Sequence, residues 1–224
     1  MGEITIIVCS SHDKDEKEEF CRNVQDTCGV SNKLLFLVNK NGVGLSQIYH
    51  NMITSTPTDI IIFIHDDIEF LRYGWGIEIV RMFNEHEDYG IIGVAGSSEF
   101  DEKGAWWTYK KIYGQVLHRN SNESWLSAFS DLLDKDLEEV CVIDGLFIAV
   151  RKDRIKSNFD KNLQGFHMYD VDFCLSNFLT KKVKIGVTTN IRLAHNSTSN
   201  LDEKWYENRE IINEKYKKYY PIKV

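Results

Sequence analysis

Hydrophobic residues in the first half of the chain switch between unbroken runs and helical spacing. The unbroken runs, at residues 4–8, 34–38, 60–64 and 91–95, predict strands buried on both faces. Between them, apolar side chains recur every three or four residues, as on one face of an amphipathic helix. These positions are Phe20, Cys21, Val24 and Cys28; Leu45, Ile48, Tyr49, Met52 and Ile53; and Trp75, Ile79, Met82 and Phe83. The order predicts a βαβαβ half in a mostly parallel sheet with right-handed crossovers.

The pattern changes between residues 96 and 138. Serines, asparagines, glycines and charges surround aromatic residues there, and only short strand-like pieces such as 115–118 interrupt them. A long segment with little regular structure is usually functional or mobile, so we expect a functional excursion from the sheet.

Regular patterns return in the last third of the chain. Apolar runs at 140–143 and 146–150 predict strands, and Asp144-Gly145 between them predicts a tight turn. Another strand is expected at 183–187. The charged tail carries apolar residues at helical spacing, which predicts a C-terminal helix; these are Trp205, Ile212, Tyr216 and Tyr219.

Composition narrows the class of protein. A chain of 224 residues with 42% hydrophobic content is long enough for one large domain. The net charge of −7 argues against nucleic acid as a partner, since binding phosphates requires a basic surface. No apolar run approaches the roughly 18 residues of a membrane span, so we expect a cytoplasmic protein. The five cysteines show no CxxC spacing and are expected to be reduced.

The strand at 60–64 runs directly into His65-Asp66-Asp67. Ligand sites in parallel α/β sheets lie beyond the carboxyl ends of the strands. His65 and Asp67 are two residues apart, so on an extended strand both would point the same way and share a divalent ion. The alternative is that the two aspartates only open a surface turn or cap a helix.

Two later segments carry further candidate chemistry. Asp170 and Asp172 lie in the first turn of a predicted helix, where the helix dipole is expected to keep them ionised and one of them could act as a general base. Simple N-capping is the alternative. His195 follows the strand at 183–187, and alone it is more often a core or surface residue than a ligand. Together with His65 and Asp67, these residues form an ordered set.

These motifs together resemble an inverting glycosyltransferase of the GT-A fold, near glycosyltransferase family two. The resemblance covers about residues 4–198 and rests on His65-Asp66-Asp67, the Asp144-Gly145 step, the helix start at 169–172 and His195. It implies one α/β domain with a Rossmann-like, mostly parallel mixed sheet flanked by helices. It also implies a nucleotide-binding half at about 1–95, an acceptor and catalytic half at about 96–198, and a C-terminal helix at 199–224.

The resemblance also implies roles for individual residues. The DxD motif of that family, which holds the metal ion, would read His65-Asp66-Asp67, with His195 as a further ligand. A nitrogen ligand favours Mn²⁺ over Mg²⁺. Asp170 matches the catalytic base of the Glu-Asp motif of the family. Tyr169 stands where the glutamate is usual, which leaves Asp172 as an alternative base.

Donor and acceptor contacts follow from the same resemblance. The donor nucleotide would contact Ser10, Ser11, Asn39, Asn41, Asn51 and Asp66. An amide such as that of Asn39 can hydrogen-bond the edge of a pyrimidine base. The acceptor would contact Trp106, Trp107, Asp144 and Gly145. Aromatic rings pack on the apolar faces of sugars, although core packing or a subunit contact would equally explain the two tryptophans.

The implied reaction is transfer of a sugar, with inversion, from a nucleotide-diphosphate sugar to a hydroxyl group. A UDP-sugar is the expected donor, and a glycan or lipid-linked molecule the expected acceptor, in bacterial surface polysaccharide or glycan synthesis. The expected location is the cytoplasm, including the inner face of the membrane. Two alternatives stay open: a metal-dependent nucleotidyltransferase or phosphoryl transferase, for which the chain has no GxxxxGK[ST] loop, and a non-catalytic nucleotide-sugar or glycan-binding protein. The sequence does not predict the oligomeric state.

Overall fold

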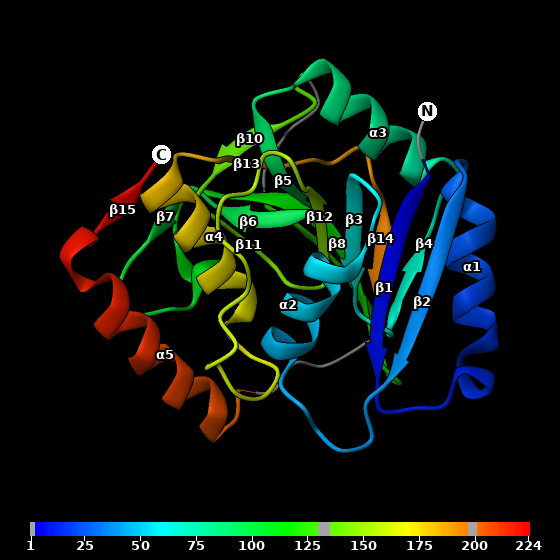
Figure 1. Ribbon diagram of the computed structural model, residues 1–224, viewed down its shortest axis with the longest axis horizontal. Helices are drawn as coiled ribbons and strands as arrows, with labels where there is room; N and C mark the ends of the chain where they lie inside the picture. The colour runs from blue at the N-terminus through cyan, green and yellow to red at the C-terminus, as the bar shows by residue number, and fades with distance from the viewer. Residues whose placement is uncertain (1–2, 130–134, 197–200) are drawn as a thin grey trace.

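The computed structural model describes residues 3–129, 135–196 and 201–224, and its core is a large mixed sheet (Figure 1). The strand order of this sheet is β10-β13-β5-β12-β3-β1-β2. The strands are β1 (Ile4–Ser10), β2 (Asn32–Val38), β3 (Ile60–Ile64), β5 (Tyr89–Gly93), β10 (Glu138–Val140), β12 (Phe147–Arg151) and β13 (Lys184–Val187). β1 pairs in parallel with β2 and β3, which confirms the predicted βαβαβ half, whereas β12 runs antiparallel to both β3 and β5.

Helices cover this sheet with the apolar stripes that the sequence predicts. α1 (Glu18–Cys28), which follows the short η1 (Lys14–Lys17), packs against α3 (Trp75–Glu85), where Trp75 Nε1 donates to Thr27 Oγ1 at 3.1 Å. α2 (Leu45–Ser55) and α4 (Tyr169–Lys181) lie in front of the central strands in Figure 1. The ring of Tyr49 on α2 lies 4.4 Å from that of Phe63 and 5.5 Å from that of Tyr169. This packing holds the start of α4 against the end of β3.

A second sheet has the order β11-β6-β8-β14-β4, with β9 paired to β8. Its strands are β4 (Ile68–Phe70), β6 (Ala95–Ser97), β8 (Ile112–Arg119), β9 (Ser124–Ala128), β11 (Val142–Ile143) and β14 (Leu193–His195). The expectation that residues 96–138 contain little regular structure is therefore wrong for the part that the structure describes; residues 130–134 lie outside it. Many of these strand positions are only partly buried, so they lack the apolar runs that mark buried strands.

The Asp144-Gly145 turn connects the two sheets. The predicted tight turn is present, but β11 pairs with β6 in one sheet and β12 pairs with β3 and β5 in the other. The apolar run at 140–143 is likewise divided between β10 and β11, because Cys141 is the point at which the chain changes sheet. This crossing places the turn beside the end of β3.

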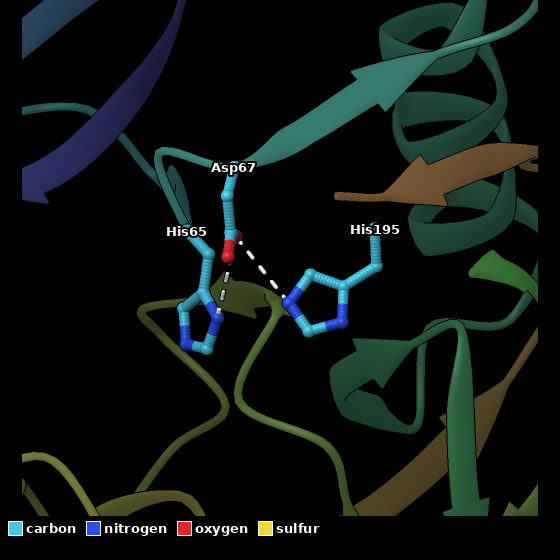
Figure 2. Close-up of side chains that lie close together, drawn as sticks. All are labelled: His65, Asp67 and His195. Atoms are coloured by element: carbon cyan, nitrogen blue, oxygen red, sulfur yellow. Dashed lines mark ion pairs between the residues drawn. The ribbon is translucent and has the colours of Figure 1, made fainter. Parts of the chain in front are cut away.

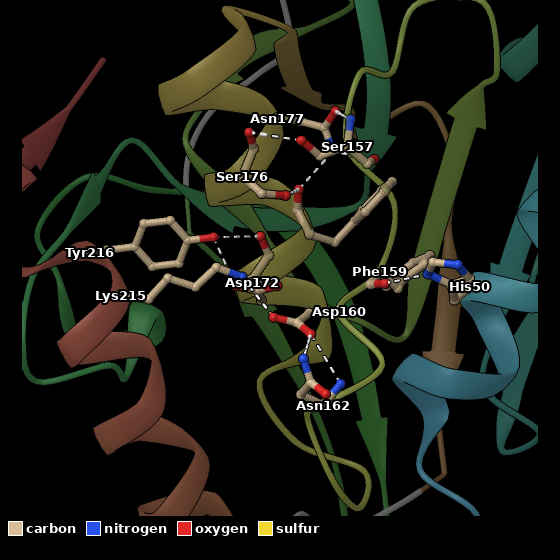
Figure 3. Close-up of polar contacts among 11 residues, drawn as sticks. His50, Ser157, Phe159, Asp160, Asn162, Asp172, Ser176, Asn177, Lys215 and Tyr216 are labelled. Carbon is tan, nitrogen blue, oxygen red and sulfur yellow. Dashed lines mark hydrogen bonds and ion pairs between the residues drawn. The ribbon is translucent and has the colours of Figure 1, made fainter.

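The C-terminal helix α5 (Glu203–Tyr216) docks on the outer side of α4 (Figures 1 and 3). Its predicted inner residues are buried except Tyr219, which lies in η3 (Lys217–Tyr219) and is 36% exposed. Buried Asn208 donates to the carbonyl oxygens of Gln164 at 2.7 Å and His167 at 3.0 Å. The chain then ends in β15 (Ile222–Lys223), which pairs with β7 (Glu99–Phe100). Residues 199 and 200 of the predicted segment lie outside the described part.

The cysteines and the lengths of the helices bear on two further expectations. All five cysteines lie within the described residues and carry free thiols. Among the helices described, none combines the length and the apolar character needed to cross a membrane.

Candidate active site

A cavity of about 890 Å³ opens where the ends of β1 and β3, the β11–β12 turn, the start of α4 and the second sheet meet. It brings together residues that the sequence analysis placed in distant segments. The predicted site residues that line it are Ser10, Ser11, Asn39, His65, Asp66, Asp67, Trp106, Trp107, Asp144, Gly145, Asp170 and His195. Three others, Asn41, Asn51 and Asp172, do not line it.

Asp67 lies between two histidines (Figure 2), and all three side chains line the cavity. Its Oδ1 is 3.3 Å from Nε2 of His195 and 4.0 Å from Nδ1 of His65. The extended geometry expected for His65 and Asp67 is wrong, because β3 ends at Ile64 and the two aspartates lie in a turn. His195 is the last residue of β14, which pairs with β4. The backbone N–H of Asn196 donates to the Asp67 carbonyl at 2.8 Å.

The charges of these three side chains are set by one another. Burial alone would raise the pKa of Asp67, but the nearby imidazole of His195, with a smaller effect from His65, outweighs it and the pKa is lowered. Burial also opposes the protonation of His195, yet Asp67 raises its pKa overall. The pKa of His65 is lowered, chiefly by burial, so His65 is neutral near pH 7. The site thus presents a carboxylate and two imidazoles.

This donor set fits a divalent metal ion. Asp67 Oδ1 is buried and makes no hydrogen bond of good geometry, although a buried carboxylate oxygen usually has a partner. The ligand atoms of His65, Asp67 and His195 all lie within 4.8 Å of one another. One carboxylate oxygen with two imidazole nitrogens suits transition-series ions better than Mg²⁺, which prefers oxygen ligands. The three predicted metal ligands therefore converge in the structure.

Asp170 faces the same cavity from the first turn of α4. Its Oδ2 accepts a hydrogen bond from the backbone N–H of Gly145 at 2.8 Å. Burial, and then the charge of Asp144, raise the pKa of Asp170 to about 7. The expectation that the helix dipole keeps this group fully ionised is therefore wrong, because desolvation outweighs the dipole. A carboxyl group with a pKa near neutrality suits proton transfer.

Asp172 does not line the cavity, and its side chain lies toward Lys215 and Tyr216 (Figure 3). Its carboxylate binds Nζ of Lys215 at 2.7 Å and accepts from the Tyr216 hydroxyl at 2.8 Å, both on α5. Burial raises its pKa, although Lys215 opposes this effect. The two aspartates lie only two residues apart in the sequence but have different surroundings. Asp170 borders the cavity, and Asp172 joins α4 to α5.

The expected nucleotide contacts are only partly assembled. The Ser10 hydroxyl donates to the Asp66 carboxylate, and Nζ of Lys17 lies 3.4 Å from the same group. The amide of Asn39 holds the loop that follows β2, since it donates one N–H to the Val43 carbonyl at 2.8 Å and accepts from the Val43 N–H at 2.9 Å. A second N–H and a second lone pair of this amide remain, so a contact with a nucleobase stays a prediction. Asn41 and Asn51 are exposed and lie outside the cavity.

Aromatic side chains also line the cavity. Trp106 is 4% exposed, and Trp107, 40% exposed, meets it at 90° with ring centroids 5.9 Å apart. The ring of Trp107 also lies 6.3 Å from that of Trp205 on α5. Phe166, which is 50% exposed, borders the same opening. The tryptophans predicted for the acceptor thus differ in burial, and only Trp107 offers much free surface.

Sequence reasoning did not identify several residues of this site. His118 lines the cavity, stacks on Trp125 at 5.2 Å and lies 5.9 Å from His195 between ring centroids. The sequence feature that could have identified His118 is its position at the end of the strand-like run 115–118. Trp205 and Phe166 also line the cavity. The helical stripe indicated that Trp205 is buried, but nothing in the sequence indicated what it borders.

The sequence matches the model of one protein family. A family model described as "Glycosyltransferase like family" matches residues 5–216. No curated protein matches the chain in sequence.

Solved structures share its fold at low sequence identity. The structure of GalNAc-T7 with UDP, GalNAc and Mn²⁺ has a TM-score of 0.64 at 11% identity, over 97% of this chain and 49% of that one. The crystal structure of S. aureus TarS has a TM-score of 0.52 at 10% identity, over 96% of this chain and 39% of that one. The Pyrobaculum calidifontis mannosyltransferase PcManGT, in complex with GDP-Man and Mn²⁺, has a TM-score of 0.51 at 8% identity, over 88% of this chain and 57% of that one. The chain thus spans about half the length of the GalNAc-T7 chain.

Proposed function

The chain belongs to the glycosyltransferase-like family whose model spans residues 5–216, and on this premise we propose that it transfers a sugar from a nucleotide-diphosphate sugar to a hydroxyl acceptor. The observation that carries the proposal is the position of Asp67, with its unpartnered carboxylate oxygen between two imidazoles, in the same cavity as Asp170. A metal-binding end and a proton-accepting end in one cavity are what this reaction requires.

The metal end would hold the leaving diphosphate. Asp67, His65 and His195 would bind a divalent ion, for which we propose Mn²⁺, the ion present with GalNAc-T7 and PcManGT. A divalent ion bound there supplies positive charge that stabilises the charge growing on a departing diphosphate. Ser10 and Lys17 hold Asp66 beside this end, and Ser10, Ser11 and Asp66 would contact the donor. A UDP-sugar is the first donor to test.

Asp170 would take the proton of the acceptor hydroxyl. Its raised pKa means that it binds a proton readily near neutral pH, and the Gly145 N–H fixes the orientation of its carboxylate. As Asp170 takes the proton, the acceptor oxygen would attack the anomeric carbon from the face opposite to the leaving diphosphate, whose bond to that carbon breaks, and this displacement gives inversion. The inverting outcome is part of this proposal, as is Asp170 as the sole base in place of Asp172.

The aromatic residues of the cavity would bind the acceptor. Trp107 and Phe166 expose ring surface at the opening, and Trp205 lies beside Trp107. Because the apolar faces of sugar rings pack on aromatic rings, we propose a glycan or a glycan-bearing lipid as the acceptor, as used in bacterial surface polysaccharide or glycan synthesis. Asp144 and Gly145 line the same cavity.

Substitution of Asp67 tests the proposal. Purified protein should be stabilised by UDP only when Mn²⁺ is present, and should slowly hydrolyse a suitable UDP-sugar. Asp67→Ala should abolish both effects with little change in the melting temperature of the free protein. His86→Ala removes a histidine from an acidic cluster outside the cavity, so it is the matched control and should behave like the wild type. Metal-dependent UDP binding without hydrolysis or transfer of any donor tested would indicate a binding protein instead.

A further inference from the structure

A hydrogen-bonded chain beginning at Gly145 ends on one of the three candidate metal ligands. The hydroxyl oxygen of Tyr169 lies 3.1 Å from the carbonyl oxygen of Gly145 and 2.8 Å from Nε2 of His65. Tyr169 is 3% exposed, so solvent has little access to this arrangement. We propose that Tyr169 is a positioning residue that holds His65 in the tautomer protonated at Nε2, so that the bare Nδ1 binds the metal ion.

The direction of each hydrogen bond follows from the available protons. The Gly145 carbonyl can only accept, so the single hydroxyl proton of Tyr169 is donated to it. The short contact between the Tyr169 oxygen and His65 is then satisfied only if Nε2–H donates to that oxygen. A neutral imidazole carries one proton, so Nδ1 has a free lone pair.

The opposite arrangement leaves two groups unsatisfied. If Tyr169 donated to His65 Nε2, the Gly145 carbonyl would lose its donor inside the protein. The His65 proton would then be on Nδ1, 4.0 Å from Asp67 Oδ1, which is too far for a hydrogen bond. In the proposed tautomer, the lone pair of Nδ1 and the carboxylate of Asp67 face each other across that distance (Figure 2). A cation between them stabilises the pair.

The surrounding structure leaves room for this hydroxyl and for little else. A Cβ atom at position 145 would lie 2.2 Å from the Tyr169 hydroxyl oxygen, so only glycine fits opposite it. The Tyr169 ring packs edge-on against Tyr49, at 5.5 Å between centroids. Metal-bound histidines commonly donate their second nitrogen to a neighbouring group, and loss of that group typically weakens metal binding 10- to 100-fold. The inference rests on the proposed metal site and adds the residue that orients one of its ligands.

Tyr169→Phe tests the role of the hydroxyl, because it keeps the buried ring and removes one oxygen. We expect the affinity for Mn²⁺, measured by calorimetry or by titration of the free-ion EPR signal, to fall about 10- to 100-fold. Tyr49→Phe is the matched control: Tyr49 is 1% exposed in the same aromatic cluster, and its affinity should stay within about twofold of the wild type. Equal affinities in the wild type and Tyr169→Phe would overturn the proposal.

Histidine NMR on the metal-free wild type tests the tautomer with Tyr169 in place. Long-range ¹H–¹⁵N correlations of ¹⁵N-labelled histidine, with His65 assigned by His65→Gln, should show protonation at Nε2 and a bare Nδ1 above the pKa of His65. Protonation at Nδ1 would overturn the inference even if Tyr169→Phe failed to fold. Wild-type protein that binds no Mn²⁺ would instead contradict the metal site of the proposed function, whichever tautomer is found.

Discussion

Lys215 on α5 and Asp172 on α4 form a largely buried ion pair, with Nζ 2.7 Å from Oδ1 of a side chain that is 1% exposed (Figure 3). The Tyr216 hydroxyl donates to the same oxygen, and Lys215 also binds Asp160 at 3.0 Å. Because Asp170 lies two residues before Asp172, this ion pair fixes the helix that carries the proposed base. The C-terminal helix thus supports the site as well as contributing Trp205 to the cavity.

Removal of Lys215 should destabilise the protein. Lys215→Met would leave Asp172 buried without its cation, and breaking a buried pair costs roughly 3–5 kcal/mol. Lys215 is 37% exposed, so solvent weakens the pair and the lower end of this range applies. We expect the free energy of unfolding to fall by about 3 kcal/mol. Lys217→Met, which breaks an exposed pair with Glu214, should cost less than about 1 kcal/mol. Urea denaturation of the two variants measures this, and equal losses would contradict the buried pair.

Asp170→Asn should remove catalysis while preserving donor binding. The amide keeps the shape of the carboxylate but cannot accept the proton of the acceptor hydroxyl, so turnover should fall by roughly 10²- to 10⁴-fold. The affinity for UDP and Mn²⁺ should stay near the wild-type value. Asp172→Asn is the contrasting variant: it should lower stability through its contacts with α5 and change turnover little. The reverse result would make Asp172 the base.

Transfer should depend on pH through Asp170. Its pKa is about 7 in the free protein, and only the ionised form can accept a proton. The value of kcat/KM should therefore fall about tenfold per pH unit below about pH 7 and level off above it. The profile should be measured at several saturating Mn²⁺ concentrations, because protons also compete with metal for histidine ligands. A profile that stays level down to pH 5 would contradict the assignment.

The same shift predicts a pH-dependent effect on stability. The pKa of Asp170 rises from 3.8, the ordinary value, to about 7 in the folded protein, so the folded state binds its proton more tightly. The contribution of protonated Asp170 to the free energy of unfolding is therefore fully present below pH 3.8 and is lost as the pH rises through 7. Asp170→Asn cannot ionise, so its melting temperature should exceed that of the wild type at pH 8 by more than at pH 5. A constant difference between the two would show that Asp170 has an ordinary pKa.

Trp107→Ala should separate acceptor use from donor chemistry. Trp107 is 40% exposed at the opening, so its removal should weaken transfer to the acceptor and leave UDP-sugar hydrolysis and metal-nucleotide binding largely intact. Trp106→Ala is the structural comparison, since Trp106 is 4% exposed and deletion of a buried tryptophan costs roughly 3–5 kcal/mol. Paired assays of transfer and hydrolysis check this. Equal losses in both assays for Trp107→Ala would place the acceptor elsewhere.

Much of the fold was predictable because its signals are local. Strands buried on both faces are apolar throughout, and helices on a sheet show one apolar stripe, so β1, β3, β5 and α1 to α3 follow from the pattern alone. The run at 34–38 also marked β2, but the expectation that it is buried on both faces is wrong, because β2 is an edge strand whose residues are only partly buried or exposed. The end of β3 also marked His65 and Asp67 as candidate ligands. The second sheet was missed, since β4, β6, β11 and β14 are only two or three residues long and the longer β8 and β9 are mostly partly buried or exposed, so none of them shows a long apolar run.

The sequence by itself determined which side chains could bind a metal or a proton, but the tertiary structure decided which of them meet. Asp170 and Asp172 carry the same signal in the same helical turn, and only the docking of α5 distinguishes the paired carboxylate from the one facing the cavity. His195 reaches Asp67 because β14 pairs with β4, and Tyr169 reaches His65 because residue 145 has no side chain. Strand pairing and helix docking depend on contacts between residues far apart in the chain, which local periodicity does not encode.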